Sequence, residues 1–160
     1  MEDRTWIFTD RRKWAPGPWL DEPDKEQWTD AATGFACLLL RDEELGSLCG
    51  YVGVPEGHPW HGRSCWDIPT GLPRDLTYSN ECEGDPEHAT ICHAAAPGDP
   101  DPLWWLGFHC ASASDLSPAF LGTPGPLPQR LRDMLTYRSA DYVRELCAQL
   151  AGEAQSAASV

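Results

Sequence analysis

The sequence predicts an α+β fold: a small antiparallel sheet with a C-terminal helix packed on one face and long Pro- and Gly-rich loops. Apolar runs of strand length occur at residues 35–41, 47–54 and 104–110. Residues 139–151 carry apolar side chains at helical spacing. The 15 Pro and 14 Gly residues among 160 favour many turns between short elements. A chain of this length is expected to bury one hydrophobic core.

Two of the predicted strands should form a hairpin. Residues 35–41 (FACLLLR) and 47–54 (SLCGYVGV) are separated only by the polar segment 42–46, which is a suitable length for a hairpin loop. Residues 104–110 (WWLGFHC) have the bulk and β-propensity of a buried strand, so we place them near the centre of the sheet. Residues 76–79 are a candidate for a further short strand.

The C-terminal part of the chain has the pattern of an amphipathic helix. Its apolar stripe consists of Tyr142, Val143, Leu146, Cys147 and Leu150. We expect Ser139 to cap the helix and Gly152 to end it. The prediction is therefore a single domain over residues 1–152 and a disordered tail over residues 153–160. Residues 1–34 hold four Trp without strand or helix periodicity, and we expect an extended arm packed on the domain.

The charge of the chain argues against several classes of partner. Acidic residues outnumber basic residues by 25 to 12, giving a formal net charge of −13. Such a chain repels a phosphate backbone unless its few cations gather on one face, so we expect no nucleic acid partner. No apolar stretch approaches the ~18 residues of a membrane span, and residues 1–14 lack the apolar centre of a signal peptide. We therefore expect no membrane partner and a cytoplasmic location.

The seven cysteines raise the question of a metal site. In a reducing compartment we expect free thiols or metal ligands rather than disulfides. Cys82, Cys92, His93 and Cys110 are candidate ligands for zinc, which binds thiolate sulfur and imidazole nitrogen. The run from Cys82 through His88 to His93 lacks the C-x2-C pair of a closed structural site. We expect at most substoichiometric zinc.

Candidate site residues gather after two of the predicted strands. The candidate binding residues are His58, His61, Trp105, His109, Ser112 and Asp115. The candidate catalytic residues are His58, Cys110 and Asp115, because a base oriented by a carboxylate can activate a thiol. We expect His58 to lie close to Cys110 and Asp115, since loops that follow two strands commonly meet at one sheet edge. The alternative is structural: His58 caps a turn and Asp115 forms an Asx-turn.

The order of motifs resembles an uncharacterised family of small proteins encoded in bacteriophages, prophages and GC-rich bacterial genomes. The resemblance extends over about residues 14–151 and rests on the patterns GYVGVPxGHPxxG, WWxGFxCAxxxDxxP and YxxxDYVxxxC. It implies a genomic setting and no particular reaction.

The chain departs from the family pattern at several candidate site positions. Residues 73–75 (PRD) replace a His-Gly-Gly group, and His109, Ser112 and Ser114 stand where the family has Asp, His and Gly. His58, Cys110 and Asp115 match the pattern. If the family's His and Asp residues form a metal or acid-base site, half of that site is lost or rebuilt here.

These observations favour a binding or interaction protein. We expect a phage or prophage accessory factor, with counter-defence as one role, that acts on a host protein or a small metabolite. The alternative is a metal-dependent hydrolase that uses His58, His109, Cys110 and Asp115. No nucleophile elbow, Walker loop or H-E-x-x-H motif is present, so the question of enzymatic activity stays open. An enzyme would gather these groups in one pocket.

The charge balance leads to a direct prediction. The protein should not retain DNA or RNA at physiological salt, because it has few cations with which to release counterions from a phosphate backbone. A gel-shift titration measures this. Binding at micromolar or lower protein concentration would contradict the prediction.

Overall fold

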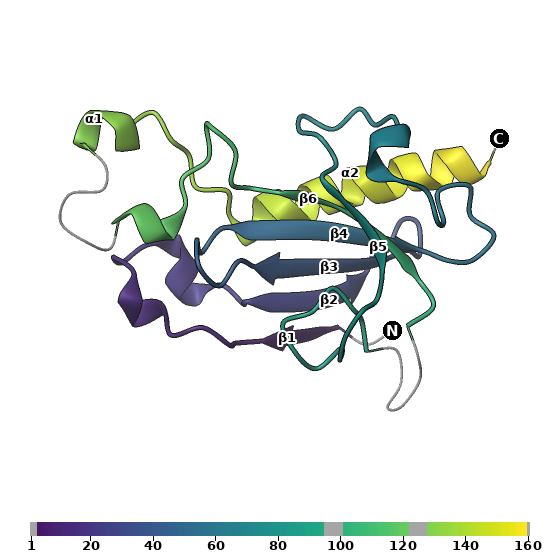
Figure 1. Ribbon diagram of the computed structural model, residues 1–160, viewed down its shortest axis with the longest axis horizontal. Coiled ribbons are helices and arrows are strands. Elements are labelled where there is room, and N and C mark those ends of the chain that lie inside the picture. The colour runs from purple at the N-terminus through teal and green to yellow at the C-terminus, as the bar shows by residue number, and fades with distance from the viewer. Residues whose placement is uncertain (1–2, 95–100, 122–127, 160) are drawn as a thin grey trace.

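The fold of the protein is a six-stranded antiparallel sheet with a long C-terminal helix across one face (Figure 1), which confirms the predicted α+β class. The computed structural model describes residues 3–94, 101–121 and 128–159. The strands are β1 (Arg4–Trp6), β2 (Lys25–Thr29), β3 (Ala36–Arg41), β4 (Leu48–Val54), β5 (Tyr78–Glu81) and β6 (Trp104–His109). The helices are α1 (Gln129–Arg132) and α2 (Ala140–Ala158), with short 3-10 turns at Arg11–Lys13, Pro18–Asp21, Cys65–Asp67 and Pro118–Leu121.

The predicted hairpin is confirmed. Strands β3 and β4 pair antiparallel, with Leu38 opposite Tyr51. The connecting loop is closed by Asp42, whose carboxylate accepts hydrogen bonds from the backbone N–H groups of Glu44 and Leu45. Gly46 completes the turn at a φ of +82°, a conformation that favours glycine.

The sheet order is β1-β2-β3-β4-β6-β5, which corrects two predictions. Strand β6 lies second from one edge rather than near the centre, because β1 and β2 extend the sheet on the far side of β3. Strand β5 begins at Tyr78 rather than at residue 76. Among the described residues, no helix combines the length and hydrophobicity needed to cross a membrane.

The prediction that residues 1–34 form only an extended arm is wrong, because β2 is an internal strand of the sheet. Its sequence KEQWT lacks the usual alternation of apolar and polar residues, because the polar residues Lys25 and Gln27 take the fully buried positions. Both side chains hydrogen-bond to backbone carbonyl groups of the segment 82–94. Trp14 and Trp19 are buried, as expected of packing anchors.

The C-terminal helix begins as predicted and ends later. The Ser139 hydroxyl accepts a hydrogen bond from the backbone N–H of Tyr142, so Ser139 is the N-cap. The helix continues through Gly152 to Ala158, and the predicted disordered tail is wrong over residues 153–158. Ala154 is fully buried in the same core as the rest of the helix. The helix continues past Gly152 for two reasons. Its alanine-rich face is buried, and alanine has the highest helix propensity. Val160 lies outside the described residues.

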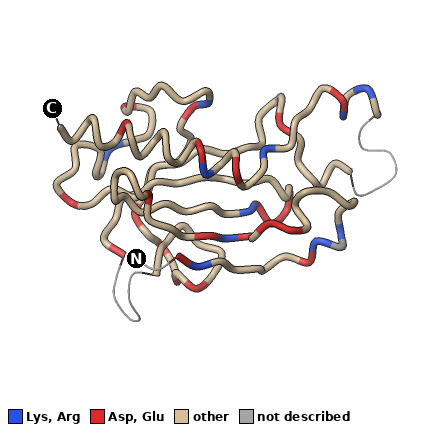
Figure 2. The backbone as a smooth tube through the Cα atoms, turned by 180° about the vertical axis from the view of Figure 1, so that it is seen from behind, with Lys and Arg blue, Asp and Glu red and all other residues tan. Residues whose placement is uncertain are grey.

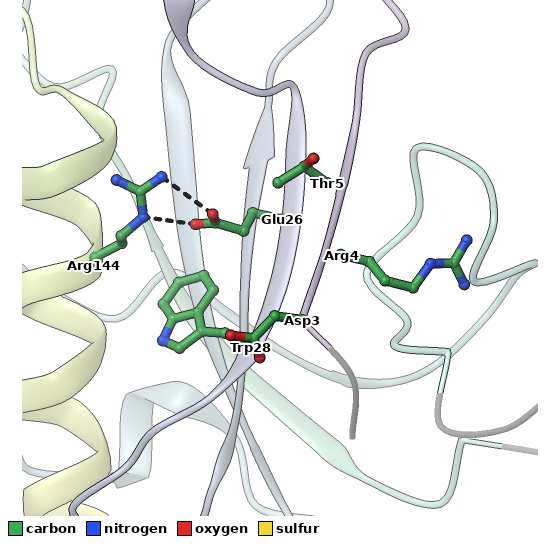
Figure 3. A pocket seen from close by; sticks show the side chains of 6 residues that line it. All are labelled: Asp3, Arg4, Thr5, Glu26, Trp28 and Arg144. Carbon is green, nitrogen blue, oxygen red and sulfur yellow. Dashed lines mark hydrogen bonds and ion pairs between the residues drawn. The ribbon is translucent and has the colours of Figure 1, made fainter.

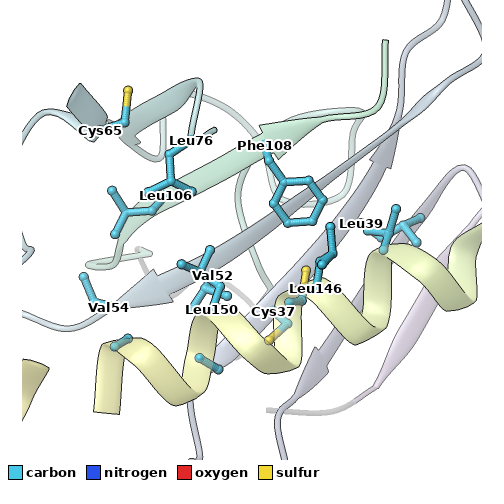
Figure 4. Packing of buried hydrophobic residues seen from close by; sticks show 14 of the residues in the cluster. Cys37, Leu39, Val52, Val54, Cys65, Leu76, Leu106, Phe108, Leu146 and Leu150 are labelled. Atoms are coloured by element: carbon cyan, nitrogen blue, oxygen red, sulfur yellow. The ribbon is translucent and has the colours of Figure 1, made fainter. Parts of the chain in front are cut away.

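The sheet has an apolar cluster on each face. Figure 4 shows the larger cluster, in which side chains from β3, β4 and β6 meet those of α2. Its labelled members include Leu39, Val52, Phe108 and Leu150. The smaller cluster lies on the opposite face, where the buried side chains are Leu38, Tyr51 and Trp105. Ile91, in the segment 82–94, packs against this second cluster.

Two glycines offer a matched test of this packing. A Cβ atom at Gly107 would overlap the Tyr51 ring and lie 2.7 Å from the Gly50 carbonyl oxygen. Gly107→Ala should therefore lower the free energy of unfolding by about 1–3 kcal/mol. A Cβ at Gly152 meets nothing within 4 Å, so Gly152→Ala should raise the free energy by roughly 0.5–1 kcal/mol. Urea denaturation measures both, and equal effects of the two changes would contradict the described packing.

Candidate functional site

Asp115, on the loop that follows β6, is the centre of a buried ion cluster. Its side chain has no exposed surface. Arg74 donates from both terminal nitrogens, at 2.8 Å to Oδ2 and 3.0 Å to Oδ1. Arg138 donates from Nε to Oδ1 at 2.8 Å, and the backbone N–H of Ser112 donates to Oδ2 at 2.9 Å. Both carboxylate oxygens are therefore occupied by donors from the protein itself.

The surroundings of Asp115 make it a poor base and a poor metal ligand. Burial by itself would raise the pKa of Asp115, but the hydrogen bonds from Arg74, Arg138 and the Ser112 backbone outweigh burial and lower this pKa to about 2. A carboxylate of such low pKa stays ionised and takes up a proton weakly. Two guanidinium groups already stand where a metal ion would approach. The cluster has the chemistry of a structural clamp.

Cys110 lies beside this cluster without the features of a nucleophile. The side chain is buried, and burial raises the pKa of the thiol to about 12. Because the thiolate is the reactive form, this cysteine is inert at neutral pH. His109 Nδ1 lies 2.9 Å from the Thr77 hydroxyl, and the Ser112 side chain is exposed. The described contacts form no Cys-His-Asp relay here.

His58 lies at the other end of the molecule, so the predicted shared site is wrong. Its Nε2 lies 2.8 Å from the carbonyl oxygen of Ala154, and its Nδ1 accepts the backbone N–H of Trp60. Asp115 instead contacts Arg138, which precedes the start of α2. The helical rise from residue 140 to residue 154 separates the two positions by about 20 Å. The turn-capping alternative holds for His58.

The separation follows from the pairing of β4 and β6. These neighbours run antiparallel, with Val54 opposite Trp104 and Cys49 opposite His109. The loop after β4 and the loop after β6 therefore leave opposite ends of the sheet. Loops that follow two strands meet at one edge only if the strands run in the same direction.

The other binding candidates are dispersed. His61 Nε2 lies 3.3 Å from the carbonyl oxygen of Pro102, and its ring lies 5.9 Å from that of Trp104. Trp105 is fully buried and donates its indole N–H to Asp101 at 2.8 Å. It therefore packs inside the fold rather than facing a ligand.

The metal candidates are only partly brought together. Cys82 and Cys92 form a disulfide, which corrects the expectation that the cysteines are thiols or metal ligands. His93 follows directly, and its ring lies 2.9 Å from the carboxylate of Asp101. Cys110 is not part of this group, because it follows the end of β6 while Asp101 precedes its start. The length of β6 separates Cys110 and Asp101 by about 20 Å.

Sequence reasoning missed Arg74 and Asp101 as site residues, and a signal in the sequence exists for Arg74. The chain has 12 basic residues against 25 acidic ones, and Arg74 is one of the 12. In so acidic a chain, the few cations are expected to form ion pairs. Arg74 also donates to the backbone carbonyl oxygen of His109, and together with the Ser112 backbone N–H it surrounds the Asp115 carboxylate.

An apolar groove of about 600 Å³ opens beside this cluster. It is lined by Ala111, Ser112, Ala113, Ser114, Asp115, Phe120, Leu131, Met134 and Leu135. Phe120, Leu131 and Met134 are exposed, and Met134 keeps 73 % of its surface accessible. The one titratable lining group is Asp115, which is already clamped. The groove can hold an apolar group and offers no acid-base pair.

A second, more polar groove of about 340 Å³ lies between β1, β2 and α2 (Figure 3). Glu26 reaches toward the helix, where Arg144 donates to it from Nε at 2.6 Å. The Arg4 side chain points away from the groove and pairs with Glu87. Glu26 and Arg144 thus neutralise each other, and Asp3 adds a second carboxylate to the lining.

The chain has 25 acidic and 12 basic residues, and Figure 2 shows residues of both signs spread over many segments of the fold. Many of the cations are bound in ion pairs within the fold: Arg4, Arg11, Arg41, Arg74, Arg138 and Arg144. Neither groove presents a basic surface. Comparison of the chain with family profiles, curated proteins and solved structures finds no significant match.

The clamp on Asp115 yields a stability prediction. Asp115→Asn should lower the free energy of unfolding at pH 7 by about 3 kcal/mol, because it leaves two partly buried guanidinium groups without a counter-charge. The exposed Asp133→Asn is the control and should change it by less than about 0.5 kcal/mol. Chemical denaturation measures both. Equal stabilities of the two variants would contradict a clamp.

The same prediction has a pH dependence. The pKa of Asp115 is lowered to about 2 in the fold, below the value of about 3.9 for an unfolded Asp. The contribution of the ionised Asp115 to the free energy of unfolding is therefore complete above pH ~4 and is lost as the pH falls toward 2. The difference between the wild type and Asp115→Asn should shrink over that range.

Proposed function

We propose that the protein is a binding protein without catalytic activity: a phage or prophage accessory factor that acts in the host cytoplasm on a host protein or a small metabolite. The observation that carries the proposal is the fate of the candidate catalytic residues. His58 and Asp115 lie at opposite ends of α2, and each is engaged in bonds within the fold. The Cys110 thiol is buried and protonated at neutral pH.

The groove beside Asp115 is the best-supported binding surface. Its volume of about 600 Å³ falls in the range of roughly 300–1,000 Å³ typical of ligand sites. Exposed apolar side chains that lie together mark interaction surfaces, and Phe120, Leu131 and Met134 are such a group. Methionine adapts its shape to a partner. The ligand is therefore expected to insert an apolar group, supplied either by a protein side chain or by a metabolite.

The setting of the proposal rests on other observations. The phage context is supported by the motif resemblance alone. The cytoplasmic location is supported by the five free cysteines, Cys37, Cys49, Cys65, Cys110 and Cys147, since free thiols persist in reducing compartments. The Cys82–Cys92 disulfide is the feature that counts against it. The hydrolase alternative has less support, because His58 lies at the far end of the molecule from His109, Cys110 and Asp115.

Groove variants test the proposal. The tagged protein is incubated with host extract, and retained proteins and small molecules are identified by mass spectrometry. Met134→Glu should weaken capture of the specific ligand by at least about tenfold, because it places a charge in an apolar contact. The control is Trp66→Glu, since Trp66 is 78 % exposed and lies outside the groove. It should leave capture unchanged, and both variants should keep the thermal stability of the wild type.

Two results would contradict the proposal. One is a ligand that Met134→Glu and the wild type retain equally. The other is hydrolysis of ester, phosphoester or amide substrates by the purified protein with added Zn²⁺ or Mn²⁺, if the activity is lost in both His58→Gln and Asp115→Asn while circular dichroism shows both variants to be folded.

A further inference from the structure

The segment between β5 and β6 brings two sulfurs and a carboxylate together. Cys82 Sγ, Cys92 Sγ and a carboxylate oxygen of Asp101 all lie within 4.8 Å of one another. Cys92 is fully buried and Cys82 is partly exposed. We call these three residues the sulfur–carboxylate cluster. Thiolate sulfur and carboxylate oxygen are both ligands that zinc takes in proteins.

The fold holds this cluster together independently of the disulfide. Lys25 Nζ donates to the carbonyl oxygens of Pro86 at 2.7 Å and His88 at 2.9 Å. Gln27 and Ala94 exchange two hydrogen bonds, at 2.8 and 3.0 Å. The segment 82–94 is therefore fastened to β2 at two places that flank Cys92. Breaking the disulfide leaves these bonds in place, so the two thiols stay near each other.

The Asp101 carboxylate differs from that of Asp115, because its hydrogen-bond donors are neutral groups and its Oδ1 accepts one hydrogen bond, which leaves a lone pair for a metal ion. Its side chain has no exposed surface. One oxygen accepts hydrogen bonds from the His93 backbone at 3.0 Å and from the Trp105 indole at 2.8 Å. The other oxygen accepts the Leu103 backbone N–H at 3.1 Å. Hydrogen bonds of this kind fix the orientation of a ligand around a metal ion.

His93 places an unsatisfied nitrogen beside the site. Its side chain is 7 % exposed, and its Nδ1 lies 2.9 Å from Asp101 Oδ1. Within the described part of the chain, this buried nitrogen has no hydrogen-bond partner of acceptable geometry. A buried polar atom without a partner is unfavourable. This nitrogen makes the surroundings of Asp101 more polar, and it flanks the sulfur–carboxylate cluster rather than belonging to it.

We propose that reduction of the Cys82–Cys92 disulfide creates a zinc site, with Cys82, Cys92 and Asp101 as ligands and a solvent molecule as the fourth. A dithiol reductant breaks the S–S bond: its two electrons and two protons give two thiols, and the reductant becomes a disulfide. Zinc binding then releases the two thiol protons to solvent. With Zn–S bonds of about 2.3 Å, the sulfurs move apart to about 3.7 Å.

The proposed zinc site is separate from the groove beside Asp115. It would hold the segment 82–94 on the sheet in both redox states. The segment 82–94 covers the second face of the sheet, where Ile91 packs against the cluster of Leu38, Tyr51 and Trp105. The disulfide fastens this cover under oxidising conditions. Bound zinc fastens the same cover in a reducing compartment, where disulfides are rare.

Metal content and thiol counts test the proposal. The full-length protein is reduced without oxygen, incubated with Zn²⁺, desalted and analysed for zinc by mass spectrometry. We expect about one zinc per reduced chain, in contrast to the substoichiometric zinc expected from the cysteine spacing, and almost none in the oxidised protein. Two thiols should become protected from a thiol reagent when zinc binds. In the Co²⁺ form, thiolate-to-metal charge-transfer absorption should appear.

Variants separate this site from other thiols. Cys82→Ser should abolish zinc retention, and Asp101→Asn, which keeps an acceptor for Trp105, should weaken it by at least about tenfold. Cys49→Ser is the matched control, because it removes a free thiol elsewhere and should retain zinc. Circular dichroism confirms that each variant is folded. Absence of zinc from the folded, reduced wild type, or equal zinc in Cys82→Ser, would overturn the proposal.

Discussion

The fold depends on a buried ion cluster at one end of the sheet, with Asp24 and Arg41 at its centre. Asp24 is 1 % exposed, and its carboxylate accepts hydrogen bonds from the side chains of Arg11 and Arg41 and from two backbone N–H groups. Arg41 also donates to the β3–β4 loop and to the Tyr137 hydroxyl. Glu22 accepts from Tyr137 and from the first residue of α2. One network thus joins the N-terminal segment, the hairpin and the start of the helix, and because buried charges are costly when unpaired, its members depend on one another.

The antiparallel order of the sheet decides what the candidate residues can do. Strands β4 and β6 are neighbours, but their exits lie at opposite ends. His58 therefore contacts the C-terminal half of α2, and Asp115 contacts Arg138 just before the helix begins. Each of these polar residues is enclosed by structural partners, which leaves the apolar groove as the accessible feature beside the strand exit. This geometry favours binding over acid-base chemistry.

The two faces of the sheet are covered by different means. Helix α2 covers one face with a continuous apolar stripe, and within this contact the Cys147 thiol donates to the carbonyl oxygens of Leu38 and Tyr51. The irregular segment 82–94 covers the other face, and buried Lys25 and Gln27 satisfy its backbone carbonyl groups. An irregular cover needs such polar fastening, since buried backbone groups must be paired. The cysteine pair of this segment adds a covalent link across it.

The sequence by itself determined the α+β class, strands β3, β4 and β6, and the start of α2, because apolar periodicity and an N-cap are local signals. It also singled out Asp115, Cys82 and Cys92, but as catalytic or metal-binding groups rather than as a clamp and a disulfide. Tertiary structure alone decided that polar β2 is an internal strand, that Gly152 lies inside a helix, and which partners the site residues take. Arg74 and Asp115 are 41 residues apart in the chain, and His58 and Ala154 are 96 apart. No local pattern encodes such pairs, because they depend on strand order and direction, which only the complete packing of the chain establishes.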